Sequence, residues 1–175
     1  MCSIPWLPPL VSSSAYDDFD EYLDALYDYF AIDFIKSNPF LLNKPVKSKR
    51  VEPYKQKDHS FWHCIEKAIP GEEICEENRE IVFPLCERIR WPRPVIEKAI
   101  ASEDVLAWTE IRRGSGTMER VHLFVPKESY VVVLDPRKLD SEGVPEYYYL
   151  WTTFICQGRQ AQSLMKRYKK NKKLI

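Results

Sequence analysis

The sequence predicts an α+β fold: N-terminal helices followed by a four-stranded antiparallel β-meander and a C-terminal helix. Three patterns predict it. Apolar residues recur at helical spacing from Phe19 to Phe30, apolar and polar residues alternate after Val105, and a basic helical pattern follows Cys156. A chain of 175 residues, 45% of them hydrophobic, is long enough to bury the core of one domain.

The first helix is expected to begin at Ser14, because Ser14 and Asp17 have the spacing of a capping box. Phe19, Leu23, Leu26 and Phe30 form its apolar stripe, and its other face is acidic. A basic, extended arm over residues 37–57 follows, interrupted by prolines at 39, 45 and 53. We therefore divide the chain into residues 1–58, an acidic helix with a basic arm, and residues 59–175, an α+β domain packed with it as one compact unit.

Three shorter elements are expected before the sheet. The apolar and aromatic residues 61–65 predict a strand, and residues 77–90 predict a second helix despite Pro84. Pro92 and Pro94 suit the first turn of a third helix that runs to residue 101.

The four strands of the meander are expected at residues 106–113, 118–126, 130–135 and 147–156. Gly114-Ser115-Gly116 forms the turn between the first two strands. Residues 130–134 are apolar on both faces, which favours a central place in the sheet. Residues 157–173 close the chain as a basic helix.

Composition and charge limit the classes of function. No apolar run reaches the ~18 residues that suggest a membrane span, and the prolines near the N-terminus make a poor signal-peptide core. The five cysteines lack a CxxC pair, so we expect reduced thiols and a cytoplasmic protein. The net charge is zero, but residues 16–33 are acidic while the arm and the tail after Cys156 are basic.

Arg120 and His122 are the first candidates for chemistry. Alternation along their strand puts both on one face, about 7 Å apart, where a cation could hold a phosphate beside a proton-transfer group. The alternative is that both lie on a solvated sheet face.

The segment 86–94 is a second candidate, because Arg88, Arg90 and Arg93 lie close to Trp91 at a junction between two helices, where two prolines fix the backbone. Guanidinium groups pair with phosphate oxygens and an indole stacks on a base, as single-stranded RNA requires. The alternative is that Arg88 pairs with an acid and Trp91 packs in the core.

His59 and His63 stand four residues apart, close to Cys64. If they lie on a strand, as expected above, their side chains are about 13 Å apart, so neither a metal site nor a cofactor is expected. His63 is then a partly buried histidine or a general base tuned by burial.

A set of short motifs, spread over residues 59–168, resembles the phage-associated branch of the barnase, EndoU, colicin and RelE-like (BECR) ribonucleases. The motifs are His63, Asn78-Arg79, Glu87-Arg88-Ile89-x-Trp91-Pro92-Arg93-Pro94, Val132-Val133-Leu134-Asp135-x-Arg137 and Trp151-Thr152-Thr153-Phe154. The resemblance implies helices followed by a four-stranded antiparallel sheet. It also implies a metal-independent endoribonuclease, of the toxin or phage-defence type, acting on mRNA or tRNA and restrained by a neutralising partner.

The resemblance also implies roles for individual residues. Arg88, Arg120 and Arg137 neutralise the scissile phosphate, His63 is the base or acid, and Thr152 helps to bind the phosphate. The remaining residues expected to contact RNA are Arg79, Trp91, Arg93, His122 and Trp151. Two other functions stay open: a non-catalytic interaction protein of a mobile element, and an RNA-binding module that leaves RNA intact. The acidic first helix could also fold over the basic site and limit access.

Overall fold

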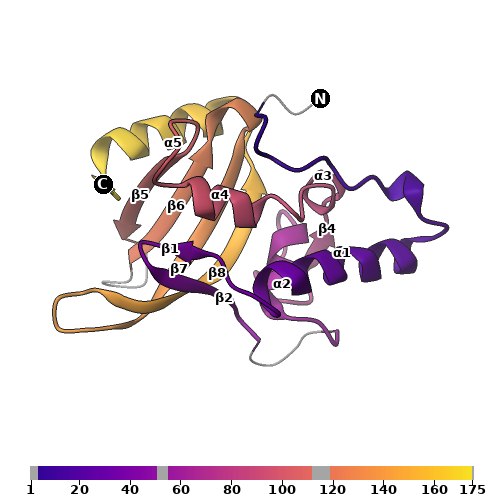
Figure 1. The fold of residues 1–175 in the computed structure, drawn as a ribbon. Helices are drawn as coiled ribbons and strands as arrows, with labels where there is room; N and C mark the ends of the chain where they lie inside the picture. The colour runs from indigo at the N-terminus through magenta and orange to yellow at the C-terminus, as the bar shows by residue number, and fades with distance from the viewer. Residues whose placement is uncertain (1–3, 51–54, 112–118, 175) are drawn as a thin grey trace.

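The computed structural model describes residues 4–50, 55–111 and 119–174. It confirms the α+β class: helices pack on both faces of one large curled sheet (Figure 1). That sheet has seven strands in the order β1-β2-β8-β7-β6-β5-β9, and not the four that were expected.

Four consecutive strands form the middle of this sheet. They are β5 (Leu106–Ile111), β6 (Glu119–Val125), β7 (Tyr130–Leu139) and β8 (Pro145–Ile155), and each pairs antiparallel with the next. The expected turn at residues 114–116 lies outside the described residues. The apolar strand β7 lies in the centre, as its burial on both faces requires.

Three further strands extend the sheet beyond this middle. β2 (Lys44–Ser48) pairs in parallel with β8, β1 (Phe40–Leu41) pairs with β2, and β9 (Lys172–Lys173) pairs with β5. The basic arm, predicted only as an extended stretch, therefore contributes two strands to the sheet.

The helices divide between the two faces. Residues of α1 (Phe19–Phe34), α2 (His59–Ile65), α3 (Phe83–Cys86) and α4 (Pro92–Lys98) form the larger core with one face of the sheet. On the other face, α5 (Arg159–Lys170) covers a smaller cluster around Trp108, Phe124 and Leu164. Because the first 58 residues supply part of the larger core and two strands, they are not a separate layer.

Two expected elements are wrong, and two helices begin later than expected. Residues 61–65 are helical and lie within α2, because a short apolar run suits a buried helix as well as a buried strand. Residues 77–90 do not form one helix: they contain β4 (Arg79–Ile81), which pairs with β3 (Glu66–Ala68), and the single turn α3, where Pro84 is tolerated. Helix α1 begins at Phe19 and is capped by Asp18, whose carboxylate accepts from the Glu21 amide at 2.8 Å. Helix α5 is shorter than expected and ends before β9.

Within the described ranges, no helix combines the length and apolarity needed to cross a bilayer. The four described cysteines are free thiols, in agreement with the sequence.

Candidate functional site

Aromatic and basic side chains gather on the sheet face that carries α5. Alternation assigns them to this face, because their strand neighbours Val46, Tyr148, Leu134 and Val121 belong to the larger core on the other side. We name this surface the aromatic–basic face and define it by seven residues: Lys47, Lys49, Arg120, Arg137, Tyr147, Tyr149 and Trp151.

The cations of this face lie over its rings. The Lys47 ammonium is 4.5 Å from the Tyr147 ring centre and the Arg137 guanidinium is 5.5 Å from that of Tyr149. Two cations contact the Trp151 ring: the Lys49 ammonium lies 5.3 Å and the Arg120 guanidinium 4.2 Å from its centre. These contacts connect β2, β8, β7 and β6 into one continuous surface of π systems and positive charge.

Trp151 owes its position to a β-bulge. In the pairing of β7 with β8, Val133 faces Thr152 while the next residue, Leu134, faces Leu150, so Trp151 is the extra residue. A bulge of this kind turns a side chain out of the regular pattern. Here it brings the indole within reach of Arg120, two strands away.

Arg120 also borders a groove of about 720 Å³ between β5, β6 and α5, which we name the β5–α5 groove. Its ionisable lining consists of Glu110, Arg120, His122 and Arg167. Glu110 accepts from two Arg167 nitrogens and, at 2.9 Å, from the Trp108 indole N–H. The groove therefore holds two guanidinium groups, a carboxylate and an imidazole in one place, beside the aromatic–basic face.

His122 is nearly buried and neutral. Its ring stacks on Trp108 at 5.2 Å, and its Nε2 lies 3.5 Å from an Arg167 nitrogen and 3.8 Å from a Glu110 oxygen. Burial lowers the pKa of His122 to about 4; the charge of Glu110 opposes this shift, and the charge of Arg167 adds to it. Burial alone would raise the pKa of Glu110, but hydrogen bonds from Arg167 and Trp108 lower it. At neutral pH the imidazole can accept a proton and the carboxylate is charged.

A pH dependence of stability follows from His122. Its pKa is about 4 in the folded protein against an ordinary 6.5, so below pH 6.5 only the unfolded chain takes up the proton and stability falls as the pH falls towards 4. Between pH 7 and pH 5, urea unfolding should show that wild type loses about 2 kcal/mol more than His122→Gln does. Equal losses in the two proteins would contradict the buried, neutral state of His122.

His63 does not line the β5–α5 groove with Arg120 and His122, but like Arg120 it lies next to Trp151. Its ring is 6.1 Å from the indole and 4.0 Å from the ring of His59, one helical turn away on α2. Both Nε2 atoms lie 3.1 Å from Glu76 Oε1. The 13 Å separation expected for a strand is wrong because the segment is a helix.

Two more of the expected residues line a second groove, of about 540 Å³, beside His63. Thr152 donates its hydroxyl to the His63 carbonyl at 2.7 Å. Arg79 donates to the Glu66 carbonyl at 3.0 Å and lies 3.6 Å from the Glu66 carboxylate. Thr152 therefore joins β8 to α2, and Arg79 joins the two strands of the β3–β4 hairpin.

The structure does not bring Arg88, Trp91 and Arg93 to the aromatic–basic face. Trp91 is 1% exposed, packs edge-on against Tyr130 and donates to the Pro8 carbonyl, so its ring has no free face for a base. Arg88 stacks on it and donates to the Pro84 carbonyl at 2.7 Å. Arg93 pairs with Glu97 and donates to the carbonyl of Asp33, in the last turn of α1. The alternative that Trp91 packs in the core is the observed one.

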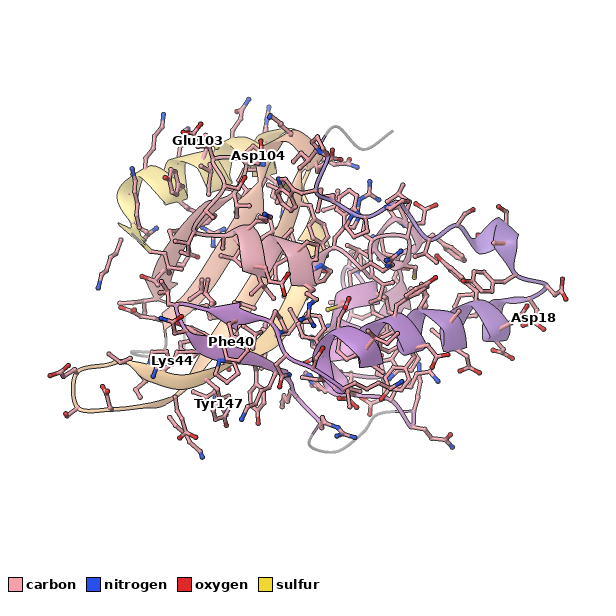
Figure 2. The ribbon with its side chains drawn as sticks, in the orientation of Figure 1. Asp18, Phe40, Lys44, Glu103, Asp104 and Tyr147 are labelled. Atoms are coloured by element: carbon pink, nitrogen blue, oxygen red, sulfur yellow. The ribbon has the colours of Figure 1, made fainter. Side chains whose placement is uncertain are left out.

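Helix α1 does not cover the aromatic–basic face. Its apolar residues Tyr22, Leu26, Phe30 and Phe34 are buried in the larger core, on the opposite side of the sheet from α5. Figure 2 shows Asp18, which caps α1, at the right of the view and Tyr147 of β8 at the lower left. The helix instead packs against the basic segment 86–94, where Arg90 lies over Tyr29 and Arg93 donates to the Asp33 carbonyl.

Comparison with known proteins identifies no relative: no family model, no curated protein and no solved structure matches the chain. The candidate site therefore depends on its own geometry.

Several site residues were missed in the sequence. Glu110 and Arg167 were missed because their pairing joins β5 to α5 across more than fifty residues. Tyr147 and Tyr149 could have been found, since they stand four and two residues before Trp151 on one strand and therefore share its face. Lys47 and Lys49 gave no such signal, because the parallel pairing of β2 with β8 is not local.

Proposed function

We propose that this protein is an endoribonuclease that binds single-stranded RNA on the aromatic–basic face and cleaves it in the adjoining β5–α5 groove. The observation that supports the proposal most is the alternation of rings and cations over four neighbouring strands. Bases stack on exposed aromatic rings while lysine and arginine follow the phosphates, and this combination binds single strands with little sequence preference.

The groove supplies groups that suit cleavage without a metal ion. In our proposal the neutral His122 takes the proton of an RNA 2′-hydroxyl, whose oxygen attacks the adjacent phosphorus. The bond from phosphorus to the 5′-oxygen breaks, and that oxygen takes a proton from solvent. The products are a 2′,3′-cyclic phosphate and a 5′-hydroxyl end.

Arg120 and Arg167 stabilise the negative charge that develops on the phosphorane. In the free protein Glu110 holds Arg167 beside His122, and the scissile phosphate would replace Glu110 as its partner. His122 takes the place of His63 as the proposed base, because His122 and Arg120 line one groove while the Nε2 of His63 is bound to Glu76.

Purified protein should therefore cut end-labelled single-stranded RNA in buffer with EDTA and leave cyclic phosphate ends. DNA of the same sequence should be bound but not cut, because it lacks the attacking hydroxyl. RNA that is bound and stays intact would remove the catalytic part of the proposal and leave an RNA-binding module. A chain that neither binds nor cuts RNA would favour the non-catalytic interaction protein.

The resemblance to BECR ribonucleases also supports a toxin or phage-defence role, exercised on mRNA or tRNA under the control of a neutralising partner. Expression in growing cells should then arrest growth, and the His122→Gln variant should relieve the arrest.

A further inference from the structure

Helix α2 presents two histidines to one carboxylate. His59 and His63 lie four residues apart, so they share a helix face and their rings stack with centres 4.0 Å apart. Glu76 comes from the loop between β3 and β4 and reaches both rings, with Oε1 3.1 Å from each Nε2. The ligand atoms of all three side chains lie within 4.8 Å of one another.

The separations between Glu76 and the two rings suit ligands around a small cation. Zinc binds imidazole nitrogen and carboxylate oxygen at about 2.0–2.1 Å, and tetrahedral angles then place neighbouring ligand atoms about 3.3 Å apart. The observed 3.1 Å between nitrogen and oxygen is close to this value. Small side-chain movements would therefore be enough to admit an ion.

The two imidazoles are also in the form that binds metal. Burial lowers the pKa of His63 to about 4 and also lowers that of His59. Burial would raise the pKa of Glu76, but hydrogen bonds from His63 and His59 lower it. Neutral imidazole and carboxylate are the forms in which these side chains bind a metal ion.

We propose that His59, His63 and Glu76 bind one divalent transition-metal ion, with Zn²⁺ as the preferred ion. Imidazole selects Zn²⁺ over Mg²⁺ and Ca²⁺, which need several oxygen ligands. The positive charges of Lys49 and Arg79 act on His59, so a cation that binds only through its charge is not favoured at this site. Three protein ligands leave a fourth position for water.

The proposal does not depend on the ribonuclease proposal, because the β5–α5 groove uses none of these three residues. Zinc binding can be measured without RNA, and cleavage can be measured in EDTA. Failure of one therefore leaves the other untouched.

The test is calorimetric titration of the full-length protein, stripped of metal with EDTA and dialysed, with Zn²⁺. One ion per chain is expected. His59→Gln and Glu76→Gln should each weaken Zn²⁺ binding by more than about 100-fold. Loss of a residue that only hydrogen-bonds to a metal ligand already costs about 10- to 100-fold. Both replaced side chains are more exposed than His63, so the variants should stay folded, which circular dichroism checks.

The matched controls are Glu77→Gln, which removes the neighbouring exposed acid, and Cys75→Ser, which removes the neighbouring thiol. Both should bind Zn²⁺ like wild type, and Co²⁺ should give the strong visible absorption of a tetrahedral site in all three proteins. The proposal would be overturned if wild type bound no stoichiometric Zn²⁺, or if His59→Gln and Glu76→Gln bound it as tightly as wild type. Loss of binding only in Cys75→Ser would also overturn it.

Discussion

Arg120→Ala is expected to lower the rate of RNA cleavage by about 100-fold or more, the usual cost of removing one donor that stabilises the transition state. Arg120 lines the β5–α5 groove with His122 and Arg167, and its guanidinium lies over Trp151. It therefore belongs both to the groove and to the aromatic–basic face. Single-turnover cleavage of labelled RNA under saturating protein measures the effect on the chemical step.

Two further variants distinguish charge from shape. Arg120→Lys keeps the positive charge but loses the planar fork, so an intermediate rate is expected. Arg90→Ala is the matched control, because Arg90 also stacks on an aromatic ring, that of Tyr29 on α1, but belongs to the other side of the molecule. If Arg120→Ala still cuts RNA like wild type, Arg120 has no part in the mechanism. If Arg90→Ala is equally impaired, the loss is not specific to the β5–α5 groove.

Tyr149→Ala is expected to weaken binding of single-stranded RNA by about 5- to 150-fold, since stacking of one base contributes about 1–3 kcal/mol. Tyr149 lies in the middle of the aromatic–basic face, between Tyr147 and Trp151 on β8, and Arg137 lies over its ring. Fluorescence anisotropy with an RNA that resists cleavage, carrying 2′-methoxy groups, measures binding alone. Tyr29→Ala is the control, because it removes the same side chain from a cation–π pair elsewhere.

The salt dependence of the same titration distinguishes the contribution of aromatic rings to RNA affinity from that of charged groups. Each phosphate contact on a single strand contributes about −0.7 to the slope of log K against log salt. Arg137→Ala should reduce the magnitude of the slope by about that amount, while Tyr149→Ala should lower affinity at every salt concentration and leave the slope unchanged. A Tyr149→Ala variant that binds RNA as tightly as Tyr29→Ala would show that the ring does not contact a base.

The sequence predicted those parts of the fold that local pattern determines. Period-two alternation identified the four central strands, and the apolar stripe of α1 and the basic pattern of α5 were found at nearly their observed positions. Strand β2 was missed because it pairs with β8, a hundred residues away, and β1 and β9 because two residues give no pattern. Non-local pairing leaves no trace in periodicity.

The candidate site, like the fold, could be predicted only where local pattern determines it. Alternation placed Arg120 and His122 on one face of β6, but it could not show that α5 covers His122 or that Glu110 and Arg167 complete the groove. The strand assigned to residues 61–65 had the larger consequence. As a helix, that segment brings His59 and His63 together, and the separation used against metal binding no longer applies.

The place where RNA binds is the central claim, and photo-crosslinking tests it most directly. Single-stranded RNA carrying 4-thiouridine, irradiated in complex with the His122→Gln variant and mapped by mass spectrometry, should crosslink to the β8 segment that contains Tyr147, Tyr149 and Trp151. Crosslinks confined to α1, to the segment around Trp91, or to the lysines at the end of α5 would contradict the account.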